Sequence, residues 1–245
     1  MHQTPPTSPT TIRLMIASEN VHKLEEMQAY FTQENLPITV VLPKSLEGLE
    51  ETGDTFTANA LLKVQFAYQQ AKDANCQWVL GDDSGFSVEA LAGQYGLPLF
   101  PGVQSNRWLT TERRGLLLGE DEDAPAFESP ITHPQRCMAV FRLLGDNPNR
   151  KGAYHCAMVL LEVSSGKMHT MEGLCPVSVA PTPELLGTNG FGYDPMVYPL
   201  ISFGIDEATG ELSDRTMAQW SMAEKNAISH RGKALAQVAT FFRGR

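Results

Sequence analysis

The sequence predicts an α/β protein, because apolar segments typical of strands alternate with segments of helical periodicity. Residues 12–17 are mostly apolar and predict a first strand, and residues 38–42 predict a second. Between them, apolar positions that include Leu24 and Met27 recur at three- and four-residue steps, as on one face of a helix. A chain of 245 residues can bury a substantial core, as one large domain or as two lobes that share a sheet.

The segment between the first strand and the first helix is a candidate phosphate-binding loop. Ser18 is suited to cap the helix, which would direct backbone N–H groups, Asn20 and Lys23 toward one point. Helix N-termini bind phosphate because their N–H groups are unpaired and the helix dipole favours an anion. An ordinary capped surface helix is the commoner outcome for such a segment, so both interpretations stay open.

A second helix is predicted over residues 55–74. Phe56 and Val64 fall at helical spacing and should face the core. Asn59 and Lys63 are four residues apart, so they share another face of the helix. If that face looks toward a ligand, Lys63 can meet a phosphate oxygen. If it looks outward, Lys63 is merely solvated.

The most informative stretch begins at a short buried strand predicted over residues 78–80. The Gly-Asp-Asp-Ser-Gly that follows at 81–85 is turn chemistry and predicts the end of that strand, with a returning strand over 86–92. Ligands of α/β proteins usually bind beyond strand ends, so Asp82 and Asp83 are candidates for holding a metal ion or activating a water. Taken alone, such a stretch is more often a solvated hairpin turn than a catalytic site.

The sequence predicts loops, helices and two strands over residues 93–174. Residues 93–102 are rich in Gly and Pro and predict a loop, and a leucine-rich helix includes residues 116–118. Residues 119–133 are acidic and predict a flexible excursion, after which Pro134 can start the next helix in its first turn. Two strands joined by a hairpin are predicted over 153–163 and 168–174.

The glycine-rich loop at 187–195 combines a flexible backbone with two aromatic residues, Phe191 and Tyr193, and the carboxylate of Asp194. Its glycine spacing does not match a dinucleotide-binding fingerprint. This combination suits a flat, hydrogen-bonding heterocycle. A tight turn whose aromatic residues cover the core is an equally good interpretation.

The C-terminal segment 221–243 is predicted to be helical, with a break at 229–232. Ser229 can cap the last helix, which places His230 and Arg231 in its first turn. Cations there oppose the helix dipole unless an anion or a carboxyl-like edge is bound, so this conflict favours a binding role over a solvated basic turn. Lys225 lies one short segment upstream and could join them.

Composition excludes several classes of protein. The formal net charge of −9 disfavours nucleic-acid binding, because the bulk field repels phosphate. No segment approaches the length of apolar sequence that a transmembrane helix needs, and the Thr- and Pro-rich residues 1–11 are expected to be a disordered tail. The four cysteines show no metal-binding spacing and are expected to be reduced core residues of a cytoplasmic protein: Cys76, Cys137, Cys156 and Cys175.

Taken in order, these segments resemble the inosine triphosphate pyrophosphatase family from about Ile12 to Leu235. The resemblance implies one two-lobed domain over 12–245, with an elongated mixed β-sheet, flanking helices, a central cleft and a homodimer. The blocks that carry it are Ser18-Glu19-Asn20-Val21-His22-Lys23, Glu50-Glu51-Thr52-Gly53 with Thr55 to Lys63, Asp82-Asp83-Ser84-Gly85, Gly190 to Pro195, and Glu224-Lys225-Asn226 with Ser229-His230-Arg231-Gly232.

The resemblance also implies roles for individual residues. Asp83 would be the general base and a metal-linked carboxylate, and Glu50 would be a Mg²⁺ ligand. The triphosphate would be held by Ser18, Asn20, Lys23, Lys63 and Ser84, and the base and sugar would be surrounded by Phe191, Gly192, Tyr193, Asp194, Lys225, His230 and Arg231.

The implied function is Mg²⁺-dependent hydrolysis of non-canonical purine nucleoside triphosphates (ITP, dITP and XTP) to the monophosphate and pyrophosphate. Donors on His230 and Arg231 suit the six-oxo acceptor of such bases, which adenine lacks. Two alternatives stay open. One is a Maf-like pyrophosphatase for other modified nucleotides, and the other is a nucleotide-binding regulator without turnover.

The chain departs from the family pattern at several places. Glu19 occupies the glycine position of the phosphate loop, and we expect its carboxylate to point out of the cleft or to supply a further metal ligand. Segments 94–100, 119–133 and 200–215 look like insertions. These departures bear on substrate preference and dimer geometry more than on the class of reaction.

Overall fold

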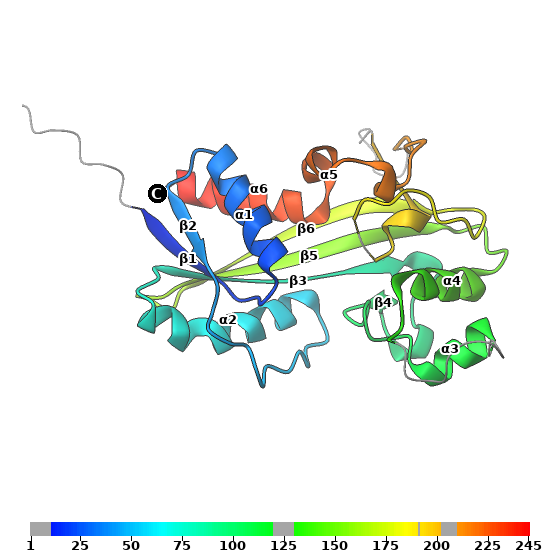
Figure 1. The fold of residues 1–245 in the computed structure, drawn as a ribbon, viewed down its shortest axis with the longest axis horizontal. Helices are drawn as coiled ribbons and strands as arrows, with labels where there is room; N and C mark the ends of the chain where they lie inside the picture. Colours follow the sequence, from blue (N-terminus) through cyan, green and yellow to red (C-terminus); the bar gives the residue numbers. More distant parts are fainter. Residues whose placement is uncertain (1–10, 120–129, 191, 202–209) are drawn as a thin grey trace, which may run out of the picture. The chain divides into compact units, whose positions relative to one another are not determined.

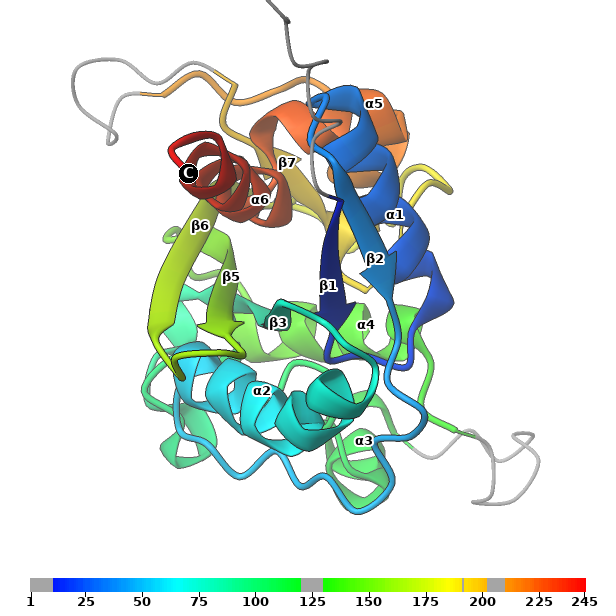
Figure 2. The ribbon, with the colours of Figure 1, turned by 90° about the vertical axis from the view of Figure 1, so that its left-hand side faces the viewer.

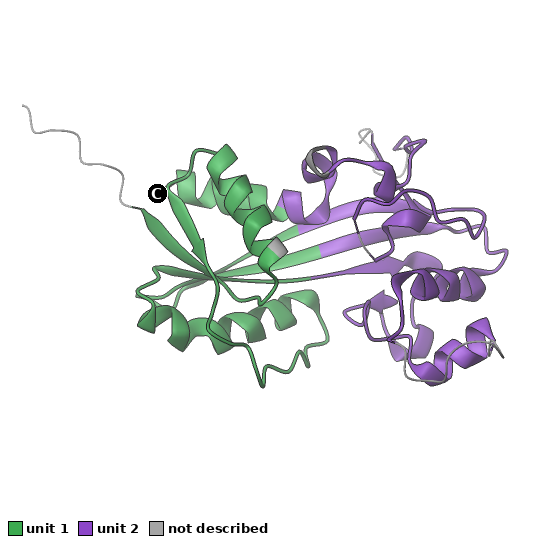
Figure 3. Ribbon diagram, in the orientation of Figure 1, with its two compact units in different colours: residues 1–83, 156–172, 234–245 green, residues 84–155, 173–233 purple. Residues whose placement is uncertain are grey.

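The structure is a computed structural model that describes residues 11–119, 130–190, 192–201 and 210–245 (Figure 1). Nearly all of the predicted tail, Phe191 and parts of two of the insertions therefore lie outside the described residues. The chain divides into two compact units (Figure 3). Unit 1 comprises residues 1–83, 156–172 and 234–245, and unit 2 comprises residues 84–155 and 173–233.

The described residues form a mixed seven-stranded sheet with helices, which confirms the predicted α/β class. The strand order is β2-β1-β3-β5-β6-β7, and β4 pairs with β3. β1 runs parallel to β2 and β3, whereas β4 is antiparallel to β3 and β7 is antiparallel to β6. The strands are β1 (Ile12–Ile16), β2 (Ile38–Val41), β3 (Trp78–Val88), β4 (Pro101–Gly102), β5 (Lys151–Glu162), β6 (Met168–Val179) and β7 (Val197–Pro199).

In unit 1, helices cover both faces of the sheet (Figure 2). α1 (Val21–Gln33) and α6 (His230–Arg243) pack on the face to which Leu14 and Ile16 point. α2 (Phe56–Asp73) packs on the opposite face, where Met15 contacts its apolar side. Successive side chains of a strand point to opposite faces, so a strand that is covered on both faces is expected to be apolar along its length. β1 is apolar except at Arg13.

The helix predicted over 55–74 is confirmed as α2. The Thr55 side chain caps it by accepting a hydrogen bond from the Ala58 N–H at 3.1 Å. A Cβ added to Gly81 would lie 2.4 Å from the carbonyl oxygen of Ala60. Glycine at this position of β3 therefore allows a close approach between the strand and α2.

The turn predicted at 81–85 and the returning strand predicted over 86–92 are wrong. β3 runs unbroken through this stretch to Val88, and neither Gly81 nor Gly85 has a positive φ. Gly81 does not form a turn; it allows α2 to pack closely on β3. The paired aspartates stay in the strand because lysine and asparagine side chains from the helices pair with them, so they do not need solvent.

Unit 2 contains shorter elements around its own core. Its helices are α3 (Thr111–Leu118), α4 (His133–Leu144), α5 (Met222–Ile228) and the 3₁₀ turns η1 (Glu89–Leu91), η2 (Gln94–Gly96), η3 (Asp194–Met196) and η5 (Met217–Gln219). α4 begins with Pro134 in its first turn, as predicted, and Thr132 and Gln135 form a capping box there. Phe86, Trp108 and Phe141 belong to the core cluster of this unit.

The four cysteines are buried and form no disulfide, as predicted for core residues. No helix among the described residues is long and apolar enough to cross a membrane. The predicted hairpin corresponds to β5 and β6, and β6 continues five residues beyond the predicted 168–174 to Val179.

Candidate functional site

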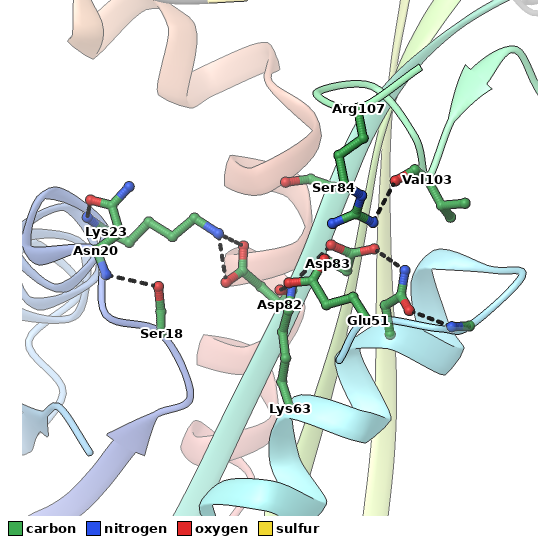
Figure 4. A network of polar contacts seen from close by, with 12 residues as sticks. Ser18, Asn20, Lys23, Glu51, Lys63, Asp82, Asp83, Ser84, Val103 and Arg107 are labelled. Atoms are coloured by element: carbon green, nitrogen blue, oxygen red, sulfur yellow. Dashed lines mark hydrogen bonds and ion pairs between the residues drawn. The ribbon is translucent and has the colours of Figure 1, made fainter. Parts of the chain in front are cut away.

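Polar and charged side chains, buried or partly buried, gather around the middle of β3 in unit 1 (Figure 4). We call this group the carboxylate–lysine cluster: Lys23, Glu51, Asn59, Lys63, Asp82 and Asp83. The aspartates come from β3, Asn59 and Lys63 from α2, Lys23 from α1, and Glu51 from the loop before α2. Sequence reasoning placed Asn59 and Lys63 on one helix face, and the structure directs that face to Asp83.

Lys63 is the hub of the cluster. Its Nζ lies 2.9 Å from Asp83 Oδ1, 3.0 Å from the carbonyl oxygen of Asp82 and 3.0 Å from Glu51 Oε1. Burial by itself lowers the pKa of Lys63, but the neighbouring carboxylates of Asp83 and Asp82 more than offset burial and the pKa is raised above 10.5. Lys63 therefore remains an ammonium at any physiological pH.

Asp83 is held at both of its carboxylate oxygens. Oδ1 accepts from Lys63, and Oδ2 accepts from Asn59 Nδ2 at 3.0 Å. Burial raises the pKa of Asp83 above 3.8 even though Lys63 and Asn59 act in the opposite direction. This carboxylate accepts a proton more readily than a solvated aspartate, which is the property that a general base needs.

Asp82 has a different environment from its neighbour. It is 1% exposed, and Lys23 Nζ donates to its two oxygens at 3.1 and 2.9 Å. Adjacent residues of a strand point to opposite faces, so Asp82 faces α1 whereas Asp83 faces α2. The two aspartates are therefore not interchangeable.

The prediction that Ser18 caps the first helix is wrong, because α1 begins at Val21. Asn20 occupies the capping position. Its Oδ1 accepts from the Lys23 N–H and its carbonyl oxygen accepts from the Leu24 N–H, each at 3.3 Å. Ser18 Oγ instead accepts from the Asn20 N–H at 3.1 Å and fixes the turn before the helix.

Glu19, the residue at the family's glycine position, is exposed and turns toward another loop. Its Oε1 accepts from the Leu46 N–H at 2.7 Å. The carboxylate is thus engaged by a backbone donor of the segment that leads to the acidic residues 47–51.

The acidic segment 47–51 ends in two adjacent glutamates, Glu50 and Glu51, which have different surroundings. Glu50, which the resemblance implied as a metal ligand, is exposed. Glu51 forms the ion pair with Lys63. Sequence reasoning did not single out Glu51, since adjacent glutamates in a loop carry no signal that tells which one turns inward.

Magnesium would find partial ligation in this cluster. Carboxylate oxygens of Asp83 and Glu51 both lie within 3.0 Å of the Lys63 ammonium. The position between these two carboxylates therefore attracts positive charge. Within the described ranges, no group of three or more His, Cys, Asp or Glu side chains is arranged to hold a metal ion. Mg²⁺ is usually coordinated by one or two protein carboxylates, with water and substrate phosphates as the remaining ligands. The carboxylates of Asp83 and Glu51 match this requirement.

A second polar group lies in unit 2 and involves the loop at 187–195. Lys225 Nζ lies 2.7 Å from Asp194 Oδ2 and also donates to the Asn189 carbonyl oxygen at 3.1 Å. Asp194 Oδ1 accepts from the Tyr154 hydroxyl at 2.7 Å. We call these four residues the Tyr154–Asn189 chain. Tyr154 was not singled out from the sequence, because an aromatic residue in a strand most often signals core.

The aromatic residues of the predicted base loop cannot all face a ligand. Tyr193 is 3% exposed, and its hydroxyl donates to the Ser105 carbonyl oxygen at 2.7 Å and accepts from Trp108 Nε1 at 2.8 Å. Its ring stacks on Phe86. For Tyr193, the structure therefore matches the alternative interpretation, in which an aromatic residue of the loop covers the core.

Gly192 supplies backbone to the same loop. It has a φ of +68°, which favours glycine, and its carbonyl oxygen accepts from the buried Cys137 thiol at 3.4 Å. Burial raises the pKa of Cys137 to about 12, so this sulfur stays protonated and can donate. Phe191 lies outside the described residues.

The basic residues His230 and Arg231 lie in the first turn of α6, as predicted. Ser229 caps α6, since its Oγ accepts from the Gly232 N–H at 3.0 Å. His230 stacks on the Tyr154 ring with a centroid separation of 5.2 Å and an interplanar angle of 15°. Arg231 is 8% exposed, and its Nη2 donates to Ser84 Oγ at 3.4 Å.

A pocket of about 760 Å³ lies elsewhere in unit 2, with Glu89, Arg150 and Lys151 among its lining residues. None of the sequence-predicted site residues lines it. Its Gly210 border adjoins residues outside the described part of the chain.

Oxygen ligands and ammonium groups brought together on an α/β scaffold are typical of proteins that act on phosphorylated substrates. The comparisons identify the family. A model of the Ham1 family matches residues 14–241, so the chain belongs to this family. The resemblance found in the sequence is thereby confirmed.

Individual relatives agree with this membership. A protein named dITP/XTP pyrophosphatase from Nostoc sp. is 35% identical over 226 residues, which are 92% of this chain and 91% of the relative. A solved structure of a HAM1 protein from Coxiella burnetii has a TM-score of 0.70 and 30% identity, covering 96% of this chain and 100% of that one. The Staphylococcus aureus Ham1 protein gives a TM-score of 0.67 at 28% identity, over 95% and 98% of the two chains.

Proposed function

We propose that this protein hydrolyses non-canonical purine nucleoside triphosphates, with dITP, ITP and XTP as substrates, to the nucleoside monophosphate and pyrophosphate. The observation that carries the proposal is Asp83, a buried carboxylate with a raised pKa that is held between Lys63 and Asn59. The family supports it, because matched relatives from several bacteria are named dITP/XTP pyrophosphatase.

In this proposal Asp83 is the general base. It takes a proton from a water molecule whose oxygen bonds to the α-phosphorus, and the bond from that phosphorus to the β-bridging oxygen breaks, so that pyrophosphate leaves. Lys63 and Lys23 offset the negative charge of the phosphates, which a chain of net charge −9 otherwise repels. Ser18, Asn20 and Ser84 are the polar groups we assign to the phosphates.

Mg²⁺ is the cofactor we propose, and Asp83, Glu51 and Glu50 are the residues that would hold it. When bound, the ion would supply Lewis-acid polarisation of a phosphoryl oxygen and neutralise charge on the leaving group. Asp83 and Glu51 come together at one ammonium group, and Glu50 precedes Glu51 on an exposed loop.

Recognition of the base is assigned to His230, Arg231 and the loop at 187–195. His230 and Arg231 can donate to the six-oxo group of hypoxanthine or xanthine, where adenine presents a donor of its own. We also assign Phe191, Gly192, Tyr193, Asp194 and Lys225 to this part of the site. Burial of the Tyr193 side chain leaves its backbone as the group that could contact a ligand.

The test is release of pyrophosphate from dITP, ITP, XTP, ATP and GTP, measured side by side with and without Mg²⁺. We expect release from the first three, little from ATP and GTP, and loss of release in Asp83→Asn. Asp146→Asn, which changes an exposed aspartate, is the matched control and should retain full activity. Equal release from canonical and non-canonical triphosphates would favour a Maf-like pyrophosphatase, and binding without release would favour a regulator.

We also propose a domain organisation, an oligomeric state and a cellular location for the protein. We propose one catalytic domain over residues 12–245, acting as a cytoplasmic homodimer that binds neither nucleic acid nor membranes. The net charge of −9 and the buried cysteines, which form no disulfide, support this setting. Light scattering coupled to size-exclusion chromatography measures the oligomeric state, and a monomer mass near 26.9 kDa would contradict the dimer.

A further inference from the structure

We infer that Tyr154 is a positioning residue for base recognition, acting through its hydroxyl on Asp194 and through its ring on His230. This inference rests on the proposed function, because it concerns how that site distinguishes one base from another. It adds a residue that the sequence did not indicate. All the contacts that carry it lie within unit 2.

Tyr154 makes contacts in three directions from β5. Its hydroxyl donates to Asp194 Oδ1 at 2.7 Å, its ring stacks on His230, and the ring also packs against Phe86 at a centroid separation of 5.2 Å. Phe86 belongs to the core of unit 2, so Tyr154 connects that core to two groups of the predicted base site. A phenylalanine could make both ring contacts, so the hydrogen bond to Asp194 is the contact that requires tyrosine.

The hydroxyl continues into a chain of hydrogen bonds that fixes the loop. Asp194 Oδ2 pairs with Lys225, and Lys225 holds the Asn189 carbonyl oxygen. The loop is folded tightly over this pair, since a Cβ on Gly190 would lie only 2.1 Å from Asp194 Oδ2 and 2.3 Å from Lys225 Nζ. The φ of +87° at Gly190 also favours glycine.

The proton on Tyr154 makes the direction of this hydrogen bond unambiguous. Burial raises the pKa of Tyr154 well above 10, and the charge of Asp194 raises it further. The hydroxyl therefore stays a donor over the whole physiological range. Asp194 thus receives one hydrogen bond at each oxygen, which fixes the carboxylate and, through Lys225, the carbonyl group of Asn189.

The experiment compares Tyr154→Phe with Tyr68→Phe. Both changes remove one hydroxyl and its hydrogen bond, and Tyr68 donates to the Val163 carbonyl oxygen at 3.2 Å within unit 1. We expect Tyr154→Phe to lower the ratio of kcat/KM for dITP over dATP by roughly tenfold, mainly through KM, because a hydrogen bond to a charged group is lost. Tyr68→Phe should leave this ratio unchanged and should lower the melting temperature no more than Tyr154→Phe does, because its hydrogen bond is to a neutral carbonyl.

Two further measurements separate failure of this inference from failure of the proposed function. Calorimetric binding of inosine monophosphate and adenosine monophosphate reports base preference without turnover. A protein that releases no pyrophosphate but prefers the inosine nucleotide, and loses that preference in Tyr154→Phe, would contradict the proposed function and support the inference. A protein with no base preference in either assay would contradict both.

A double-mutant cycle with Asp194→Asn tests the route of the effect. If the hydroxyl acts through Asp194, the two substitutions together should cost no more discrimination than the larger of them alone. Fully additive losses, or a Tyr154→Phe variant that discriminates as well as Tyr68→Phe, would overturn the inference. If Tyr154→Phe does not fold, Asp194→Asn by itself tests whether the chain of hydrogen bonds sets the base preference.

Discussion

Each compact unit contains an ion pair between a buried lysine and an aspartate, and the two pairs are surrounded differently. In unit 1, Lys63 and Asp83 are 2.9 Å apart, and the ammonium also pairs with Glu51. In unit 2, Lys225 and Asp194 are 2.7 Å apart, and the remaining contacts are to a tyrosine hydroxyl and a backbone carbonyl. Lys63 and Lys225 are similarly buried, at 8% and 7% exposed.

The difference lies in the balance of charge. Around Lys63, carboxylates outnumber ammonium groups, and burial raises the pKa of Asp83. Such an arrangement leaves negative charge that a cation or a proton can neutralise. Around Lys225, one ammonium meets one carboxylate, and neutral dipoles complete the contacts. A pair of this kind is suited to holding a loop in place, so we propose that the same two residue types serve chemistry in one unit and positioning in the other.

The largest expected effect comes from neutralising the two aspartates in turn. Asp83→Asn should lower kcat by about 10³ for every triphosphate alike, since removing a general base typically costs 10² to 10⁴. Asp194→Asn should lower kcat much less and should act mainly on the preference between bases. Steady-state kinetics with dITP and dATP measure both effects. Equal losses of kcat in the two variants would remove the proposed distinction between the pairs.

Replacing Lys63 tests the surplus of negative charge. Lys63→Met should destabilise the protein by about 3 to 5 kcal/mol at pH 8, because it leaves buried carboxylates without their cation. The exposed control Lys44→Met should change the stability little. Urea unfolding gives the free energies. Lys225→Met should cost less than Lys63→Met, since it removes the cation from one carboxylate whereas Lys63→Met removes it from two.

The pH dependence of the Lys63→Met deficit has a defined sign. Without the ammonium, the folded-state pKa of Asp83 rises further above the unfolded value, so the folded protein binds the proton more tightly. Stability of the variant then falls as pH rises through this window and recovers as pH is lowered. The gap between wild type and variant should therefore narrow below neutral pH. A gap that stays constant from pH 8 to pH 5 would contradict this account.

A smaller effect is expected at Glu19, which anchors the acidic loop of unit 1 by one hydrogen bond to the Leu46 N–H. Glu19→Ala should cost about 1 kcal/mol and raise KM severalfold without abolishing turnover, because a single exposed hydrogen bond is lost. Glu19→Gln retains an acceptor and should behave almost as wild type. A large gain in turnover on Glu19→Gly would instead mean that the carboxylate opposes the phosphates.

The smallest effect concerns α5, the helix that carries Lys225. The pKa of Glu224 is lowered to about 2, first by the backbone N–H of Ser221 and then by Arg215. A depressed pKa contributes stability that is present above 4.5 and is lost as pH falls toward 2. Glu224→Gln should flatten this part of the stability curve. Thermal unfolding between pH 5 and pH 2 measures it, and an unchanged slope would contradict the assignment.

Local patterns predicted most of the secondary structure. The helix at 55–74, the cap at Ser229 and Pro134 at the start of α4 follow from periodicity and capping chemistry, which depend on neighbours within a few residues. The errors at 81–85 and at Ser18 have a common cause. Gly, Asp and Ser suit both turns and buried sites, and only a packed partner decides between them.

The sequence by itself determined the α/β class, the family and the shared helix face of Asn59 and Lys63, because each is recorded in spacing along the chain. The tertiary structure alone decided that Glu51 reaches Lys63, that Asp82 and Asp83 face different helices, and that Tyr154 holds Asp194. Tyr154 and Asp194 are 40 residues apart, and Lys63 and Asp83 are 20 apart. Contacts at such separations arise when strands and helices pack, which is why local sequence carries no direct signal for them.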